Sequence, residues 1–194
     1  MANSHERQDR YEVRLAGTGG QGMILAGMIL SEAVAIYDGG NAVQTQSYGP
    51  EARGGSSKSE VILSSGNIYY PKVINADLLL CMSQEACDKY YYDLKRDGLL
   101  ILDSTYVERA PTSRAVCAPI SQIAVDATGR EITAAMVALG MICGLTDVVS
   151  QDSLEKAIGA RVPRGSEAMN LAAMHAGLTE AIRIRELAHI KEAG

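Results

Sequence analysis

The sequence predicts an α/β fold: a single Rossmann-like layered domain with a mostly parallel central sheet and a C-terminal helical cap. Short apolar runs of strand length alternate with helical segments through about the first 120 residues. A glycine-rich stretch at 17–22 stands between the first expected strand and the first expected helix. The chain beyond residue 130 has helical character, which indicates helices packed as a separate layer.

Strands are expected where polar and apolar residues alternate, or where short apolar runs stand between turn residues. Residues 11–16 and 41–47 alternate, whereas 77–82 and 98–102 are continuously apolar, as in strands buried on both faces. The remaining expected strands are 57–63, followed by a hairpin turn at 64–67, and 116–120.

Helices are expected where longer stretches lack proline and have a cap or a terminal glycine. Residues 22–36 are apolar and stop before Gly39-Gly40, and Ser83 is placed to cap a helix over 83–96. The segment 132–145 is apolar nearly all round, so it must be covered by this domain's core or by another subunit. Two more helices are expected, at 153–158 and from about 166 into the 180s.

One domain is expected. A chain of 194 residues with 47% hydrophobic residues can bury a full core, and neither a linker nor a repeat interrupts it. The expected parts are a polar N-terminal tail over 1–10, the domain over 11–185, and a frayed C-terminal tail over 186–194.

Composition restricts the partners and the location. The net charge of −5 gives no electrostatic support for binding nucleic acid. No apolar run approaches the ~20 residues that span a bilayer, and the polar N-terminus has no signal region. The four cysteines lack C-x-x-C spacing, which excludes a sequence-local zinc or iron–sulfur site and indicates buried free thiols. We therefore expect a cytoplasmic protein that contacts neither nucleic acid nor membrane.

The glycine-rich stretch fits G-x-G-x-x-G and consists of Gly17, Thr18, Gly19, Gly20, Gln21 and Gly22. Glycine permits a tight turn there and lets backbone N–H groups approach an anion at the helix N-terminus. A dinucleotide site also needs an acidic residue at the end of the second strand, where this chain has Thr45-Gln46-Ser47. Three interpretations stay open: close strand–helix packing, a phosphate contact, and NAD or FAD binding.

A second unusual stretch follows the second strand and consists of Tyr48, Gly49, Pro50, Glu51, Ala52, Arg53, Gly54 and Gly55. Proline stiffens it, while the glycines allow backbone conformations that other residues avoid. The Arg53 guanidinium, beside flexible backbone amides and nearby serine hydroxyls, is suited to grip a carboxylate or phosphate bidentately. The alternative is an internal Glu51–Arg53 ion pair that only shapes the loop.

These stretches carry a family resemblance. G-T-G-G-Q-G at 17–22, Y-G-P-E-A-R-G-G at 48–55, Tyr70-Pro71 and A-D-L-L-L-C-M at 76–82 resemble the gamma subunit of 2-oxoacid:ferredoxin oxidoreductases. The resemblance covers about residues 11–185, with the motifs in the same order and spacing. The form of 48–55 resembles the 2-oxoglutarate-type and related enzymes more than the indolepyruvate branch.

The resemblance implies an assembly that converts a 2-oxoacid, coenzyme A and oxidised ferredoxin to acyl-CoA, carbon dioxide and reduced ferredoxin. It implies alpha, thiamine-binding beta and ferredoxin-like delta subunits, which hold thiamine diphosphate, Mg²⁺ and [4Fe–4S] clusters. The gamma chain then has no catalytic residue or metal of its own and holds no cofactor alone. Its contact with coenzyme A, the substrate or a partner subunit is expected at 17–22 and 48–55.

The sequence itself also shows no set of residues expected of a catalytic centre. The family's thiamine pattern, G-D-G followed by Asn, is missing. His175 lies on the helical stripe 168, 171, 175, 178 and 182, which favours a core or interface histidine over a catalyst. Asp103, Ser104 and Thr105 at a strand end are typical of a helix cap or a turn.

We therefore expect a non-catalytic subunit of an oxidoreductase that acts on the oxo group of donors, with an iron–sulfur protein as acceptor. Our hypothesis is that the 48–55 loop, with Arg53 foremost, closes over the active-site entrance beside the thiamine-binding subunit. Two rivals remain: a stand-alone reductase that binds NAD(P) or flavin, and a purely structural subunit.

Overall fold

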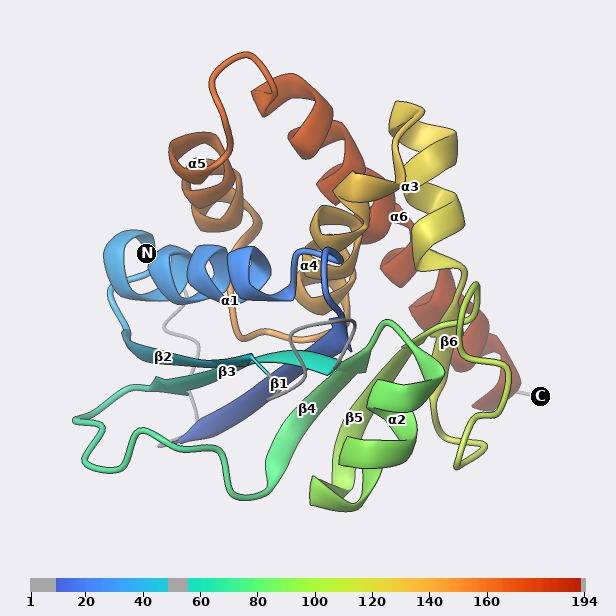
Figure 1. The fold of residues 1–194 in the computed structure, drawn as a ribbon, viewed down its shortest axis with the longest axis horizontal. Helices are drawn as coiled ribbons and strands as arrows, with labels where there is room; N and C mark the ends of the chain where they lie inside the picture. Colours follow the sequence, from blue (N-terminus) through green and yellow to red (C-terminus); the bar gives the residue numbers. More distant parts are fainter. Residues whose placement is uncertain (1–9, 49–55, 193–194) are drawn as a thin grey trace.

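The computed structural model describes residues 10–48 and 56–192. Its centre is a six-stranded sheet in the order β2-β3-β1-β4-β5-β6 (Figure 1). The strands are β1 (Tyr11–Thr18), β2 (Asn41–Tyr48), β3 (Ser56–Ser64), β4 (Ala76–Cys81), β5 (Leu94–Asp103) and β6 (Val116–Ala118). Each of the six expected strands is present, because alternation and short apolar runs both reflect burial of a pleated surface.

Five of the six strands point in the same direction. β1, β4, β5 and β6 form parallel pairs, whereas β3 is antiparallel to both β1 and β2. The prediction of a mostly parallel sheet is confirmed. The hairpin turn predicted at 64–67 is wrong, since β3 pairs with β1 and β2 and the chain passes β1 to reach β4. The apolar β4 needs neighbours on both sides, and this position between β1 and β5 supplies them.

The helices cover the two faces of the sheet unequally (Figure 1). On one face Leu15, Leu78 and Leu80 pack against five helices, while on the other Leu79 and Cys81 pack against α2. Alternate side chains of β4 are therefore buried in two separate hydrophobic cores, one on each face of the sheet. The helices are α1 (Met23–Glu32), continued by a π-helical turn (Ala33–Tyr37), α2 (Gln84–Tyr90), α3 (Ile120–Thr128), α4 (Ala134–Leu145), α5 (Gln151–Arg161) and α6 (Glu167–Glu192).

Three predicted boundaries need correction. The helix expected over 83–96 ends at Tyr90, because the chain enters β5 at Leu94 after one 3₁₀ turn. Ser83 is its N-cap as predicted, and its hydroxyl accepts from the Ala86 N–H at 3.2 Å. The strand expected over 116–120 ends at Ala118, and α3 follows it. A third boundary is that of the last helix, expected into the 180s, which extends to Glu192.

The helical layer is held by backbone contact between α4 and α6. A Cβ on Gly140 would lie 1.9 Å from the Met174 carbonyl oxygen, and one on Gly177 would lie 2.0 Å from that of Val137. All but two of the twelve residues of α4 are buried. Apart from the exposed Ile132, the apolar segment 132–145 therefore belongs to the core of this domain, which decides between the two interpretations left open by the sequence.

The buried face of α6 differs from the predicted stripe. Ala173, Met174 and Ala181 are buried against α4, whereas His175 is exposed and its Nε2 lies 2.8 Å from Glu155 Oε1. Of the two positions expected for His175, the core position is wrong, and the interface position stays a prediction. The stripe shifts because the contacting face of α6 follows the small residues that permit close approach.

No single helix among the described residues is both long and apolar enough to cross a bilayer. One pair passes jointly on length and composition, Ile120–Thr128 with Glu131–Leu145, and it is bent by 118°.

Candidate functional site

The glycine-rich stretch and the two flanks of the 48–55 stretch lie together where β1 and β2 end, and we call this side of the sheet its carboxyl edge. β1 ends at Thr18, which is paired with Ser56 at the start of β3, and β2 ends at Tyr48, which is paired with Ser57. The Ser57 hydroxyl donates to the Thr18 carbonyl at 3.3 Å. Residues 49–55 lie outside the described residues, but both of their flanks are at this edge. Ligands of open α/β sheets bind at the carboxyl ends of the strands, which is where the glycine turn and these flanks lie.

Gln21 closes the glycine turn from within. Its Oε1 accepts from the Thr18 N–H at 2.7 Å, and its Nε2 donates to the Met82 carbonyl at 3.0 Å. The side chain thus ties the end of β1 to the segment that follows β4. It also occupies the Thr18 N–H, one of the backbone donors that a phosphate-binding turn would offer to its ligand. The sequence analysis included Gln21 in a possible phosphate contact and did not predict these internal hydrogen bonds.

The glycines of this turn divide into two groups. A Cβ on Gly17 would lie 2.4 Å from Gln21 Oε1, and one on Gly22 would lie 3.0 Å from the Ala135 Cβ. Gly22 also has φ 77° as the residue before α1. In contrast, a Cβ on Gly19 or Gly20 would meet no atom within 4 Å. Gly17 and Gly22 therefore serve packing, and the outer pair faces open space where another molecule can approach.

The positions of Asp38 and of β2 do not fit the dinucleotide interpretation. Asp38 lies before β2, at the opposite edge of the sheet, where its carboxylate accepts from the Ser150 N–H at 2.9 Å and the Ser153 hydroxyl at 2.7 Å. It therefore holds Ser150, the N-cap of α5, and does not reach a ribose. In addition, β3 separates β1 from β2, so the end of β2 is not adjacent to the glycine turn as in the dinucleotide fold.

A charge network joins β1 to β3 on the α2 face of the sheet. Lys58 Nζ lies 2.7 Å from Glu60 Oε1, and the Arg14 Nη2 lies 2.9 Å from the same oxygen. Arg14 also forms an ion pair with Asp93, and its guanidinium lies 5.2 Å from the centre of the Tyr90 ring. The network joins β1, β3 and the end of α2. It therefore fixes β3, the strand that follows the 48–55 stretch, to the centre of the sheet.

The cysteines do not form a metal site. Cys81 and Cys87 are buried on the α2 face, Cys143 is half-buried in the helical layer, and Cys117 is exposed, so the expectation of buried thiols is wrong for Cys117. A hydrogen bond between Cys81 and Cys87 raises the pKa of Cys81 and lowers the pKa of Cys87. Within 10–48 and 56–192, no three His, Cys, Asp or Glu side chains gather to hold a metal ion.

Asp103 at the end of β5 has a structural role. It is fully buried, its Oδ2 accepts from the Ser121 hydroxyl at 2.6 Å, and its Oδ1 accepts from the Thr105 N–H at 3.0 Å. These bonds hold the turn after β5 and the first turn of α3. The predicted cap or turn role is confirmed.

The fold and this edge define a class of protein: an α/β domain whose glycine motif is used largely in its own packing, through Gly17, Gln21 and Gly22. Residues 12–180 match the family described as pyruvate ferredoxin/flavodoxin oxidoreductase. The chain belongs to this family, and the resemblance to its gamma subunits is confirmed by relatives of that type.

Three relatives illustrate the match. The 2-oxoglutarate synthase subunit KorC of Methanocaldococcus jannaschii is 48% identical over 179 residues, which cover 90% of this chain and 96% of that protein. The gamma subunit of a keto/oxoacid ferredoxin oxidoreductase from Geobacter sulfurreducens PCA is 47% identical, with a TM-score of 0.82 over 91% of this chain and 98% of that one. The 2-oxoglutarate:ferredoxin oxidoreductase from Magnetococcus marinus shares the fold alone, at 23% identity and a TM-score of 0.77, over 90% of this chain and 31% of that longer chain.

Proposed function

We propose that this chain is the gamma subunit of a 2-oxoglutarate:ferredoxin oxidoreductase. The observation that carries the proposal is the near full-length identity of 48% to a 2-oxoglutarate synthase subunit. The assembly would convert 2-oxoglutarate, coenzyme A and oxidised ferredoxin to succinyl-CoA, carbon dioxide and reduced ferredoxin. Relatives named for ketoisovalerate and pyruvate are more distant, at 32% and 29% identity, which favours 2-oxoglutarate among the three substrates.

The redox cofactors are proposed to lie on partner subunits. Thiamine diphosphate with Mg²⁺ supplies the carbanion chemistry of decarboxylation when bound, and [4Fe–4S] clusters carry the electrons. A cluster needs grouped cysteines, but here Cys81 and Cys87 lie on one face of the sheet and Cys143 lies in the helical layer on the other. This distribution supports alpha, thiamine-binding beta and ferredoxin-like delta partners as the holders of these groups.

The proposed task of this chain lies at the edge where the two stretches meet. Arg53, within the 49–55 segment, would bind a carboxylate of the substrate or a phosphate of coenzyme A, or would contact the thiamine-binding subunit. The open space over Gly19 and Gly20 lies on the same edge and would admit part of such a ligand. The charge network of Arg14, Lys58 and Glu60 would hold the loop's return strand during this contact.

Reconstitution with the other subunits tests the proposal. The complex is expected to reduce ferredoxin with 2-oxoglutarate and coenzyme A at a higher kcat/KM than with pyruvate or 2-oxoisovalerate. Arg53→Ala is expected to raise the KM for coenzyme A or for 2-oxoglutarate, whereas exposed Arg109→Ala, which contacts only Asp88 through its side chain among the described residues, is the matched control. Normal turnover and normal CoA dependence of Arg53→Ala would refute the role of the loop.

The two rivals make different predictions. A stand-alone reductase would be stabilised by NAD(H), NADP(H) or flavin. If the melting temperature does not rise at millimolar cofactor, that interpretation is excluded. If the remaining subunits turn over fully without this chain, it contributes neither to catalysis nor to assembly. If they assemble without it but turn over slowly, a purely structural role is excluded.

A further inference from the structure

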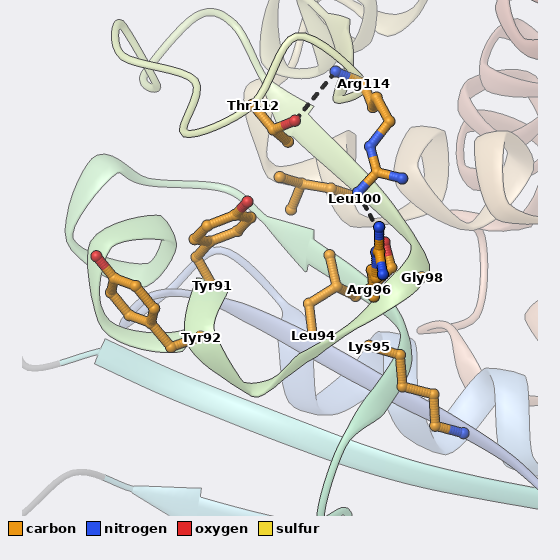
Figure 2. A pocket seen from close by; sticks show the side chains of 9 residues that line it. All are labelled: Tyr91, Tyr92, Leu94, Lys95, Arg96, Gly98, Leu100, Thr112 and Arg114. Carbon is orange, nitrogen blue, oxygen red and sulfur yellow. Dashed lines mark hydrogen bonds between the residues drawn. The ribbon is translucent and has the colours of Figure 1, made fainter.

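A small pocket lies over the amino-terminal half of β5, on the α2 face of the sheet (Figure 2). It has a volume of about 250 Å³. Leu94, Gly98 and Leu100 form its floor, and Tyr91 and Tyr92 form one wall. The glycine turn and the flanks of 49–55 are instead at the carboxyl ends of the strands.

The pocket exists because the outer edge of β5 is only partly paired. Among the described residues, β6 pairs with Ile101, Leu102 and Asp103 alone. The first part of β5 is instead met by the segment that precedes β6, where Arg114 Nη2 donates to the Arg96 carbonyl at 2.7 Å. Figure 2 shows the Arg114 guanidinium beside Arg96 at the wall opposite the tyrosines. Because a side chain and not a further strand covers this part of β5, a recess forms beside it.

The pocket carries an excess of positive charge. Lys95 is compensated by Asp77, with Nζ to Oδ1 at 2.7 Å, and Arg114 lies 3.9 Å from the highly exposed Asp97. The Arg96 guanidinium has no hydrogen bond or ion pair with any other described residue. This local positive charge stands on a chain whose net charge is −5. It therefore favours an acidic ligand by electrostatic complementarity.

The aromatic wall points to a protein ligand. Tyr92 is 87% exposed, and its ring meets that of Tyr91 edge-on with centroids 5.6 Å apart. Tyrosine and arginine are the residue types enriched at protein–protein interfaces, where they often contribute most of the binding energy. A volume of about 250 Å³ is smaller than the ~300–1,000 Å³ typical of small-molecule sites and accommodates one or two side chains.

We propose that this pocket receives an acidic side chain, together with an adjacent apolar one, from another subunit of the same oxidoreductase. The carboxylate binds Arg96 and Arg114, and the apolar group packs on Tyr91 and Leu100. The inference rests on the proposed function only in requiring that the chain works within an assembly. It adds a second contact, at the opposite end of the strands from Tyr48 and Ser56, which flank the 49–55 segment.

Charge reversal tests the contact. Affinity between this chain and the other subunits is measured by titration at several salt concentrations, with Arg96→Glu, Arg114→Glu, Arg96→Lys and, as control, Arg164→Glu on the exposed α5–α6 connection. Each reversal at the pocket is expected to weaken binding at least tenfold and to reduce its salt dependence, while Arg96→Lys and Arg164→Glu stay within twofold. Circular dichroism and melting temperature verify that the variants fold. Affinities within twofold of wild type for both pocket reversals would overturn the proposal.

A photo-crosslinking amino acid at position 92 identifies the occupant in the assembled complex. The expected product joins Tyr92's position to a peptide of another subunit that contains Asp or Glu. A cross-link to a second copy of this chain alone, or no cross-link, overturns the proposal. So does tight binding of inorganic phosphate at Arg96 in the isolated chain, which would mark a small-anion site. Turnover with 2-oxoglutarate is scored separately, so a failed docking contact and a wrong substrate give different results.

Discussion

Arg14 of β1 and Glu60 of β3 form an ion pair inside the protein: Nη2 and Nε of Arg14 lie 2.9 and 3.0 Å from Glu60 Oε1, and the side chains are only 4% and 11% exposed. Lys58 shares the same carboxylate oxygen. Both cations also lie over the Tyr90 ring, at 5.2 Å for Arg14 and 5.6 Å for Lys58, so water has little access to replace a lost partner. The pair therefore ties the return strand of the 48–55 loop to the centre of the sheet.

Glu60→Ala is expected to destabilise the isolated subunit by about 2–3 kcal/mol, because buried Arg14 keeps only the half-exposed Asp93 and Lys58 loses its carboxylate. The free energy of unfolding in urea measures the effect. Lys156→Ala, which breaks a fully exposed pair with Asp152, is the control and should stay close to wild type. Equal stability of the two variants would show that the buried pair is not a structural tie.

Gly177→Ala and Gly159→Ala should act in opposite directions. A methyl group at Gly177 would lie 2.0 Å from the Val137 carbonyl oxygen, so α6 must move away from α4 at a cost of about 3 kcal/mol. A methyl group at Gly159 of α5 meets nothing within 4 Å and should stabilise the protein by about 0.5–1 kcal/mol through helix propensity. Thermal melts of both variants verify the order, and a stable Gly177→Ala protein contradicts the close packing of α4 and α6.

Gln21→Leu should destabilise the fold by about 1–3 kcal/mol, since the Thr18 N–H and the Met82 carbonyl both lose their partner. Gln21→Glu keeps an acceptor for Thr18 but loses the donor to Met82. Its stability relative to wild type should therefore recover on acidification, when the protonated carboxyl regains a donor. Urea unfolding at neutral and acidic pH measures this difference. An unchanged unfolding midpoint for Gln21→Leu would mean that Gln21 does not hold the turn.

Alkylation of the folded subunit should distinguish its four thiols. Cys117 is exposed and should react first at pH 8, while Cys81 and Cys87 should react only after unfolding because they are buried. Burial raises the pKa of Cys143 to about 11. Its thiolate fraction, and with it the labelling rate, should rise about tenfold per pH unit up to that value. Mass spectrometry of iodoacetamide-treated protein reads each site, and rapid labelling of Cys143 at pH 8 would contradict this order.

The sequence predicted most of the elements because their signals are local. Alternation over 11–16 and the apolar run at 77–82 report burial of each strand, and Ser83 marks its helix by its own side chain. Predictions failed where a distant contact decides. Leu94 belongs to a strand rather than to the preceding helix because β4 pairs with it, and His175 is exposed because α6 turns its small residues toward α4.

By itself, the sequence determined the layered α/β class, the glycine turn and the family to which the chain belongs, since each depends on residue types at fixed spacing. Only the tertiary structure decided that β3 lies between β1 and β2, which brings residue 18 beside the flanks of 48–55 and separates Asp38 from the glycine turn. It also decided that Gln21 fills the turn and that Arg96 and Tyr92 share a pocket. The physical reason is that strand order and side-chain contacts depend on the packing of segments far apart in the chain, which a local pattern does not encode.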